Sequence, residues 1–188
     1  IGLELRALGI NMNFAPTIDI YSTLESTVIG PRSFGEDPEY TGILGAAWAK
    51  GHADAGIIAT AKHFPGHGDT DVDSHGALPI ININLDTLFS RELIPFMSLI
   101  ESGVPAIMTG HIIYTALDKK YPATLSKVIL QDLLRKELGF EGLIISDSIE
   151  MNAIKNYYGS FDKTSVMAVN AGVDILLYTG MGNAKSAY

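Results

Sequence analysis

Five short apolar runs recur along the chain, and polar residues cluster after several of them. Most of these runs are nearly continuous hydrophobic stretches, without alternation of apolar and polar positions. Parallel strands buried on both faces of a sheet have this pattern. The sequence therefore predicts parallel strands at Ile10–Ala15, Gly56–His63, Ala106–His111, Gly142–Ser146 and Val173–Tyr178.

Amphipathic stretches separate these runs and predict helices at residues 37–56, 84–103, 125–139 and 162–172. Asp37 and Ser126 are the expected caps of the first and third helices, because short polar side chains accept hydrogen bonds from the free N–H groups of a first turn. Pro95 is expected to kink the second helix. The repeated order of strand and helix predicts an α/β protein with a parallel sheet.

The positions of the polar residues favour one α/β architecture. They follow the strands at Asp19 and Arg32, at residues 62–75, at His111 and at Asp147. In a (β/α)8 TIM-type barrel the loops after the strands form one face that holds the active site. A doubly wound open sheet would gather such residues at one switch point. We therefore predict a (β/α)8 barrel, and because five strands cannot close one, we expect residues 1–188 to be a fragment of it.

Composition narrows the function classes. The chain has 188 residues, no cysteine, a net charge of −8 and 47% hydrophobic residues. An acidic chain is a poor partner for nucleic acid or an anionic membrane. The lack of cysteine excludes disulfides and thiolate chemistry. The sequence shows neither a signal peptide nor an apolar run of the ~18 residues that a membrane span needs, and it leaves the compartment open, cytoplasmic or secreted and lipid-anchored.

The stretch KHFPGHGDTDVDSH, residues 62–75, gathers three histidines, three aspartates and a lysine. Asp73 and His75 are two positions apart, so a carboxylate–imidazole hydrogen bond can fix the tautomer of His75 and favour its protonated form. Such a histidine can donate and accept protons near neutral pH. The plainer alternative is a surface loop with incidental charges, which the PGHG turn makes less attractive.

A metal site is the competing hypothesis for this loop. His63, His67, Asp69, Asp73 and His75 include the ligand types of a metal-dependent hydrolase. Their spacing matches none of the specific metal signatures. We therefore predict that no metal is bound among them, and that His67 and Asp69 hold the loop through local hydrogen bonds.

Asp147 lies in GLIISDSIEM, directly after a predicted strand. A carboxylate at the mouth of a buried strand is partly desolvated and fixed in direction, as a nucleophile must be. The alternative is a helix N-cap for residues 148–157, since aspartate is a preferred cap. Glu150 is the nearby rival, expected on that helix and pointing elsewhere.

Cationic side chains are expected at the same mouth. Lys62 and His63 end an apolar strand, and a lysine there must reach polar surroundings because burying it unpaired is costly. Arg32 lies in a Gly/Pro-rich loop, where its guanidinium can grip a carboxylate, a phosphate or a sugar hydroxyl. Its alternative is a salt bridge to Glu36 or Asp37.

Two further histidines have simpler expected roles. His111 ends its strand in TGH, and we expect it to contact the residues of the site rather than the substrate. His52 lies in a helix–loop stretch and is expected to be a solvated surface residue.

Four stretches in chain order carry a family resemblance: NFAPTID, VIGPRSFGEDP, KHFPGHGDTDVDSH and PATLSKVILQDLLRKELGFEGLIISDSIEM. Together they resemble the bacterial β-N-acetylhexosaminidases of glycoside hydrolase family 3, over essentially the whole chain. The resemblance implies a (β/α)8 barrel, no cofactor, and a retaining mechanism on terminal N-acetylglucosamine. It implies Asp147 as nucleophile, His75 as general acid/base with Asp73 as its partner, and sugar binding by Arg32, Lys62 and His63.

The resemblance also sets the expected domain content. The first barrel strands of the family, with a DQEGG-like substrate-binding motif, are absent, so residues 1–188 correspond to roughly strands three to seven of the catalytic barrel, with no second domain visible. Expected substrates are peptidoglycan fragments or chitooligosaccharides. A phosphorylase with phosphate as acceptor, a metal-dependent hydrolase and a non-catalytic sugar-binding module are the alternatives.

Overall fold

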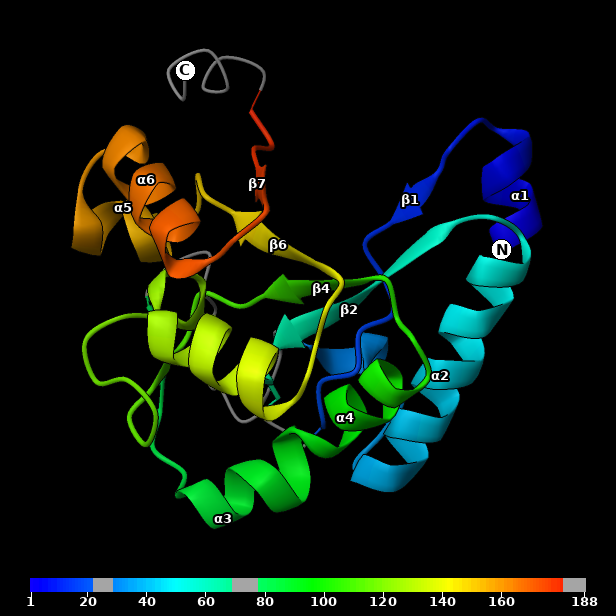
Figure 1. The fold of residues 1–188 in the computed structure, drawn as a ribbon, viewed down its shortest axis with the longest axis horizontal. Helices are drawn as coiled ribbons and strands as arrows, with labels where there is room; N and C mark the ends of the chain where they lie inside the picture. Colours follow the sequence, from blue (N-terminus) through cyan, green and yellow to red (C-terminus); the bar gives the residue numbers. More distant parts are fainter. Residues whose placement is uncertain (22–28, 69–77, 181–188) are drawn as a thin grey trace.

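The computed structural model describes residues 1–21, 29–68 and 78–180. Its main sheet contains five parallel strands that curl into a half-barrel, as Figure 1 shows. Along the sheet the strands follow their order in the chain: β1 (Met12–Asn13), β2 (Ile58–Phe64), β4 (Ala106–Thr109), β6 (Leu143–Ser148) and β7 (Ile175–Leu177). The α/β class and the parallel neighbours predicted from the apolar runs are confirmed.

Helical segments connect the strands and cover the outer face of the sheet (Figure 1). They are α1 (Gly2–Ala7), η1 (Gly30–Arg32), α2 (Pro38–Asp54), α3 (Leu85–Thr87), η2 (Leu88–Glu92), α4 (Ile94–Glu101), η3 (Ala123–Leu125), η4 (Val128–Glu137), α5 (Asn152–Tyr158) and α6 (Phe161–Ala171). A small parallel pair, β3 (Ile80–Ile81) with β5 (Ile113–Tyr114), lies outside the main sheet. The apolar-run pattern did not predict this pair.

The local signals at the helix ends act as the sequence predicts. The Asp37 carboxylate accepts a hydrogen bond from Tyr40 N at 2.8 Å and begins α2. The Ser126 hydroxyl accepts from Ile129 N at 3.3 Å at the start of η4. The helical path through residues 84–103 is broken into α3, η2 and α4, and Pro95 lies in the first turn of α4, where its missing N–H costs no hydrogen bond.

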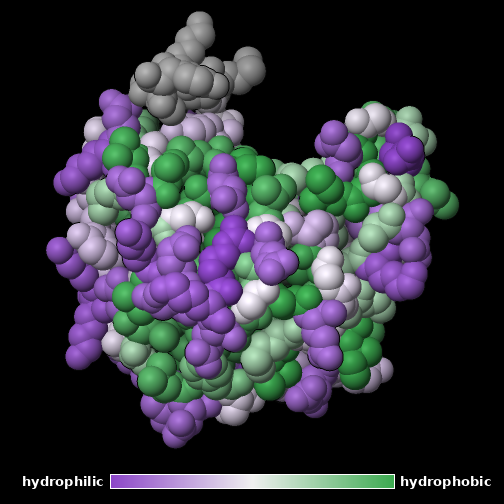
Figure 2. All heavy atoms as spheres, in the orientation of Figure 1, coloured by the Kyte–Doolittle hydropathy of each residue, from purple (hydrophilic) through white to green (hydrophobic). Residues whose placement is uncertain are grey.

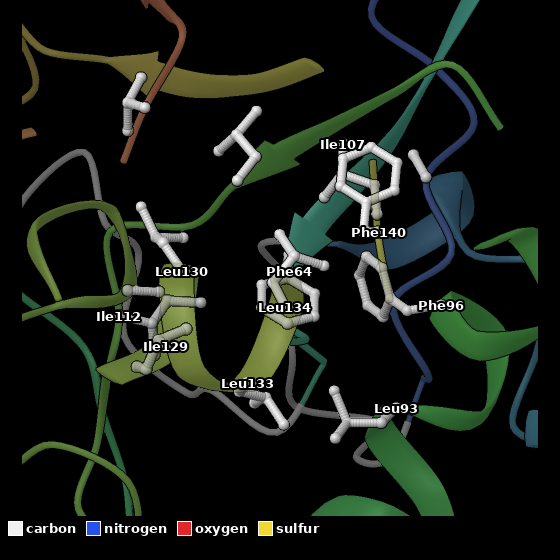
Figure 3. Close-up of a cluster of buried hydrophobic side chains, with 14 of the residues drawn as sticks. Phe64, Leu93, Phe96, Ile107, Ile112, Ile129, Leu130, Leu133, Leu134 and Phe140 are labelled. Atoms are coloured by element: carbon white, nitrogen blue, oxygen red, sulfur yellow. The ribbon is translucent and has the colours of Figure 1, made fainter. Parts of the chain in front are cut away.

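The main hydrophobic core lies between the sheet and the helices (Figure 3). Phe64 from β2 contacts Phe96 from α4 edge to face, with ring centroids 5.2 Å apart. Leu130 and Leu134 from η4 and Ile107 from β4 are fully buried in the same cluster. Aromatic pairs in this geometry add to the stabilisation from buried apolar area. The core therefore packs strands β2 and β4 against helices α4 and η4.

The opposite face of the sheet carries a second, smaller cluster. Ala106, Met108 and Ile145 are buried there, and three partly buried side chains, Met12, Ile58 and Leu177, pack against them. Figure 2 shows hydrophobic side chains along the notch between α1 and the β6–β7 side. In the described ranges, no helix is long and apolar enough to cross a membrane.

His52 corrects one expectation. The prediction of a solvated surface residue is wrong, because His52 is only 3% exposed. Its ring stacks on Trp48 with centroids 3.6 Å apart, and its Nε2 lies 3.3 Å from Asn13 Nδ2. The ring therefore packs α2 against β1, a long-range contact that a helix–loop pattern does not reveal.

Candidate active site

The candidate site lies at the carboxyl ends of three adjacent strands. Lys62 and His63 are near the end of β2, His111 comes two residues after β4, and Asp147 is the penultimate residue of β6. β2 pairs with β4 and β4 pairs with β6, all in parallel. The structure thus brings these side chains to one edge of the sheet, where the active sites of parallel α/β folds lie.

Asp147 is half-buried, and its Oδ1 accepts a hydrogen bond from Ser148 N at 2.7 Å. Burial by itself raises the pKa of the Asp147 carboxyl. Electrostatic interaction with His111 and His63, the Ser148 hydrogen bond and Lys62 together outweigh burial and hold this pKa below the ordinary 3.8. Asp147 is therefore an ionised carboxylate among cationic groups.

The helix-cap alternative for Asp147 is wrong. Helix α5 begins at Asn152, its N-cap residue is Met151, and no side chain caps it. Asp147 instead belongs to β6, which runs two residues further than the predicted strand. The side chain is thus held by sheet geometry.

Lys62 lies within the electrostatic reach of both Arg32 and Asp147. Burial and the like charge of Arg32 lower the pKa of the Lys62 ammonium, while Asp147 and Asp19 raise it in part. Arg32 itself is exposed at the end of η1. The carboxylate of Asp37, one of its two suggested partners, caps α2. The described structure therefore places Arg32 and Lys62 near the same mouth.

His63 is held by a buried carboxylate. Asp19 has 0% side-chain exposure, and its Oδ2 lies 2.8 Å from His63 Nδ1. Asp19 also accepts from His63 N at 3.0 Å and from His67 N at 2.7 Å. Burial raises the pKa of the Asp19 carboxyl, but the attraction of His63 and these hydrogen bonds lower it overall. The bond from the backbone N–H of His67 spans 48 residues of the chain, so His67 holds this stretch by a long-range hydrogen bond as well as by the local ones that the sequence predicts.

His111 joins two strand ends behind Asp147. It is 1% exposed, with Nδ1 2.8 Å from the Thr124 hydroxyl and Nε2 2.8 Å from Ser148 O. Since a carbonyl only accepts, Nε2 carries a proton in this arrangement. The Thr124 hydroxyl lies 2.8 Å from that of Thr109 at the end of β4. His111 therefore fixes the residue that follows Asp147, the supporting position expected for it.

Glu150 is not part of a helix, so that expectation is wrong. It lies before α5, and its Oε2 accepts from Thr179 N at 2.6 Å and from the Thr179 hydroxyl at 3.1 Å. The carboxylate thus ties the end of β6 to the segment after β7. It shares with Asp147 a hollow of about 350 Å³, lined by Asp147, Ser148, Glu150, Met151, Asn152 and Thr179.

Three of the predicted loop residues, Asp69, Asp73 and His75, lie outside the described residues. Of the five proposed metal ligands, His63 and His67 are among the described residues. The Nδ1 atom of His63 is already engaged in a hydrogen bond with Asp19. Among the residues that the structure describes, no group of three or more histidine, aspartate or glutamate side chains is arranged to hold a metal ion.

The glycines of the KHFPGHG stretch are required by close approaches. A Cβ on Gly68 would lie 1.5 Å from Ile20 O, and one on Gly66 would lie 2.6 Å from Glu92 Oε2. Tyr114 OH also donates to Gly66 O at 2.7 Å. Gly68 therefore packs directly against the backbone of Ile20, in the segment that carries Asp19.

We expect Gly68→Ala to destabilise the protein by about 1–3 kcal/mol or more, the usual cost of overpacking against atoms that cannot move aside. Gly51→Ala is the matched control, because a Cβ on Gly51 in α2 meets nothing within 4 Å. That substitution should be neutral or stabilise by roughly 0.5–1 kcal/mol. Urea unfolding of both variants measures the difference, and equal stabilities would contradict the described contact.

The buried His67 predicts acid sensitivity. It is 2% exposed, and burial, followed by electrostatic interaction with His63, lowers the pKa of the His67 ring from 6.5 to about 4. Between these values the unfolded chain binds a proton that the folded chain does not, so stability is complete above pH 6.5 and falls as the pH drops toward 4. This shift corresponds to ~3 kcal/mol. His67→Gln should flatten the unfolding free energy over that range, and an unchanged slope would contradict the assignment.

A curled parallel α/β sheet with an ionised carboxylate and several cations at its carboxyl edge is the arrangement of barrel-type enzymes. Residues 1–184 match the family model described as the N-terminal domain of glycosyl hydrolase family 3, and the chain belongs to this family. This membership agrees with the resemblance of the sequence motifs.

Similar proteins have consistent names. The chain is 43% identical to β-hexosaminidase A of Pseudoalteromonas piscicida over 94% of its own length and 31% of that protein. It is 49% identical to a solved family 3 β-N-acetylglucosaminidase from Paenibacillus sp. FPU-7, with a TM-score of 0.92 over 94% of this chain and 34% of that one. NagZ of Neisseria gonorrhoeae, solved with N-trifluoroacetyl-D-glucosamine, is 36% identical over 94% of this chain and 50% of that one, with a TM-score of 0.84. The chain thus spans a third to a half of these three proteins.

Proposed function

We propose that the chain forms part of the catalytic (β/α)8 barrel, roughly strands three to seven, of a retaining exo-β-N-acetylglucosaminidase. The names of its relatives support the activity, and the curled parallel half-barrel supports the architecture. The substrate class is glycans that end in β-linked N-acetylglucosamine, with peptidoglycan fragments or chitooligosaccharides as the natural sources.

The observation that carries the proposal is the state of Asp147. Its pKa is held low by neighbouring positive charge, and it lies beside a hollow at the end of β6. An ionised, oriented carboxylate can attack the anomeric carbon and form a covalent glycosyl-enzyme as the aglycone oxygen leaves. The nearby Lys62 and histidine rings stabilise the ionised form of the Asp147 carboxylate.

We assign the proton transfers to His75, with Asp73 as its partner, on the motif alone. In the first step the imidazolium donates its proton to the leaving oxygen. In the second step the neutral imidazole takes a proton from water, which attacks the anomeric carbon and releases Asp147. This departs from the usual pair of carboxylates in retaining glycosidases, but the proton balance is the same.

Arg32, Lys62 and His63 are assigned to sugar binding. Lys62 and Arg32 supply N–H donors for hydroxyl groups at the mouth. The electrostatic coupling of Lys62 to both Arg32 and Asp147 supports a common site. The same cations would also attract phosphate, and a neutral imidazole does not repel an anion as a carboxylate does. A phosphorylase that uses the same residues is therefore the second candidate.

The test is an assay of the full-length protein on an aryl β-N-acetylglucosaminide, with and without phosphate. A hydrolase gives N-acetylglucosamine in both conditions, with retained β configuration in the first-formed sugar. A phosphorylase gives N-acetylglucosamine 1-phosphate when phosphate is present. Absence of aryl release from the folded protein, or loss of activity with a chelator and recovery with metal, would reject the proposal.

A further inference from the structure

We propose that Asp19 is a positioning residue that sets the tautomer of His63 and joins the segments that carry the sugar-binding residues. The inference rests on the proposed function, because it gives His63 a task in binding the sugar. The sequence pattern identifies Asp19 only as a polar residue after a predicted strand, and the family resemblance assigns it no role.

The hydrogen bonds around Asp19 require a particular protonation of His63. A carboxylate only accepts hydrogen bonds. Its Oδ1 faces the N–H groups of His63 and His67, and its Oδ2 lies 2.8 Å from His63 Nδ1. A lone pair on Nδ1 at that distance would face another lone pair, so Nδ1 carries the proton. The bond is buried, with 8% exposure for the His63 side chain and 0% for that of Asp19.

The consequence appears at the other ring nitrogen. With Nδ1 directed to Asp19, Nε2 is the ring nitrogen that remains to meet a substrate. In the neutral ring Nε2 accepts a hydrogen bond from a sugar hydroxyl, whereas the opposite tautomer would only donate. Asp19 therefore decides which kind of hydrogen bond His63 can offer.

The backbone of Asp19 and its neighbours also links two parts of the site. The Ser33 hydroxyl donates to Asp19 O at 2.7 Å, beside Arg32 in the chain. Two residues on from Asp19, Tyr21 N donates to Gly35 O at 2.9 Å, and Ile18 N donates to Lys62 O at 2.9 Å. The segment around Asp19 thus holds the Arg32 loop on one side and the end of β2 on the other.

The direct test is ¹⁵N NMR of the full-length protein labelled at histidine, with the His63 signals assigned from a His63→Gln variant. We expect the neutral tautomer, with its proton on Nδ1 and none on Nε2, in the native protein. In Asp19→Asn the amide can donate to Nδ1, and we expect the proton to move to Nε2. A native His63 that carries a proton on Nε2, alone or as the imidazolium, overturns the proposal, and the reading of the native protein requires no catalytic activity.

The kinetic test separates positioning from simple support of the fold. Asp19→Asn should lower kcat/KM on an aryl β-N-acetylglucosaminide by about 10- to 100-fold, the range for losing a charge-assisted hydrogen bond. In a His63→Ala background the same change should cost less than about threefold, because the residue through which Asp19 acts is gone. Equal losses in both backgrounds would overturn the proposal.

Asp174→Asn is the matched control. Asp174 accepts from Ile144 N at 2.8 Å and from Arg135 Nη2 at 2.7 Å, at the opposite end of β6. Loss of these hydrogen bonds in Asp174→Asn should lower the thermal stability of the protein. The tautomer of His63 and the KM should stay unchanged. If the native protein shows no glycosidase activity, the proposed function fails, while the NMR result still decides the role of Asp19.

Discussion

Replacing Asp147 with alanine in the full-length protein should abolish turnover on every substrate, including aryl glycosides with good leaving groups. Without the carboxylate no covalent glycosyl-enzyme can form, and the rate should fall by roughly 10⁴-fold or more, as for other removed nucleophiles. The measurement is kcat/KM on an aryl β-N-acetylglucosaminide, together with a thermal melt to show that the variant is folded.

Glu150→Gln is the control for that experiment. Glu150 shares the hollow with Asp147, but its carboxylate is occupied by Thr179, and a glutamine oxygen can still accept from Thr179 N. Its loss of activity should be far smaller. A folded Asp147→Ala enzyme that still turns over an activated substrate would show that the nucleophile is another residue.

His75→Ala should damage natural disaccharides much more than activated aryl glycosides in the first chemical step. A sugar alkoxide leaves poorly without a proton, whereas an activated aryl oxide leaves readily. The second step still needs a base, so the glycosyl-enzyme should accumulate with the aryl substrate. Burst kinetics and mass spectrometry of the trapped protein measure this accumulation.

Addition of azide distinguishes an acid/base role of His75 from a role in binding. A small anion attacks the glycosyl-enzyme without a base and should restore turnover of the aryl substrate by His75→Ala. Asp73→Ala should behave as a weaker version, because His75 loses its partner and its proton affinity falls. Equal losses on both substrate types without rescue by azide would make His75 a binding residue.

The sequence predicted those features of the fold that depend on local patterns. The five apolar runs became five parallel neighbours, and Asp37 and Ser126 cap their helices, because burial periodicity and caps act over a few residues. The strand ends were less certain, since β6 runs on to Ser148 and so includes Asp147. The roles of the site residues came from the family motifs and remain predictions.

What the sequence missed depends on contacts between distant segments. His52 looked exposed, yet it stacks on Trp48 and contacts Asn13. Asp19 gave no signal of the bonds it makes 44 and 48 residues along the chain. Long-range hydrogen bonding has no periodicity to read. A polar residue after a predicted strand was the available hint.

The agreement between strand order in the sheet and strand order in the chain bears on how the protein is made. Each strand of the main sheet pairs with the next main-sheet strand to be synthesised, in the order β1, β2, β4, β6 and β7, and all these pairings are parallel. Since chains emerge from the ribosome amino end first, every new strand finds its edge already in place. The sheet can therefore grow by addition at one edge during translation, and the carboxylate of β6 arrives after its cationic partners on β2 are positioned.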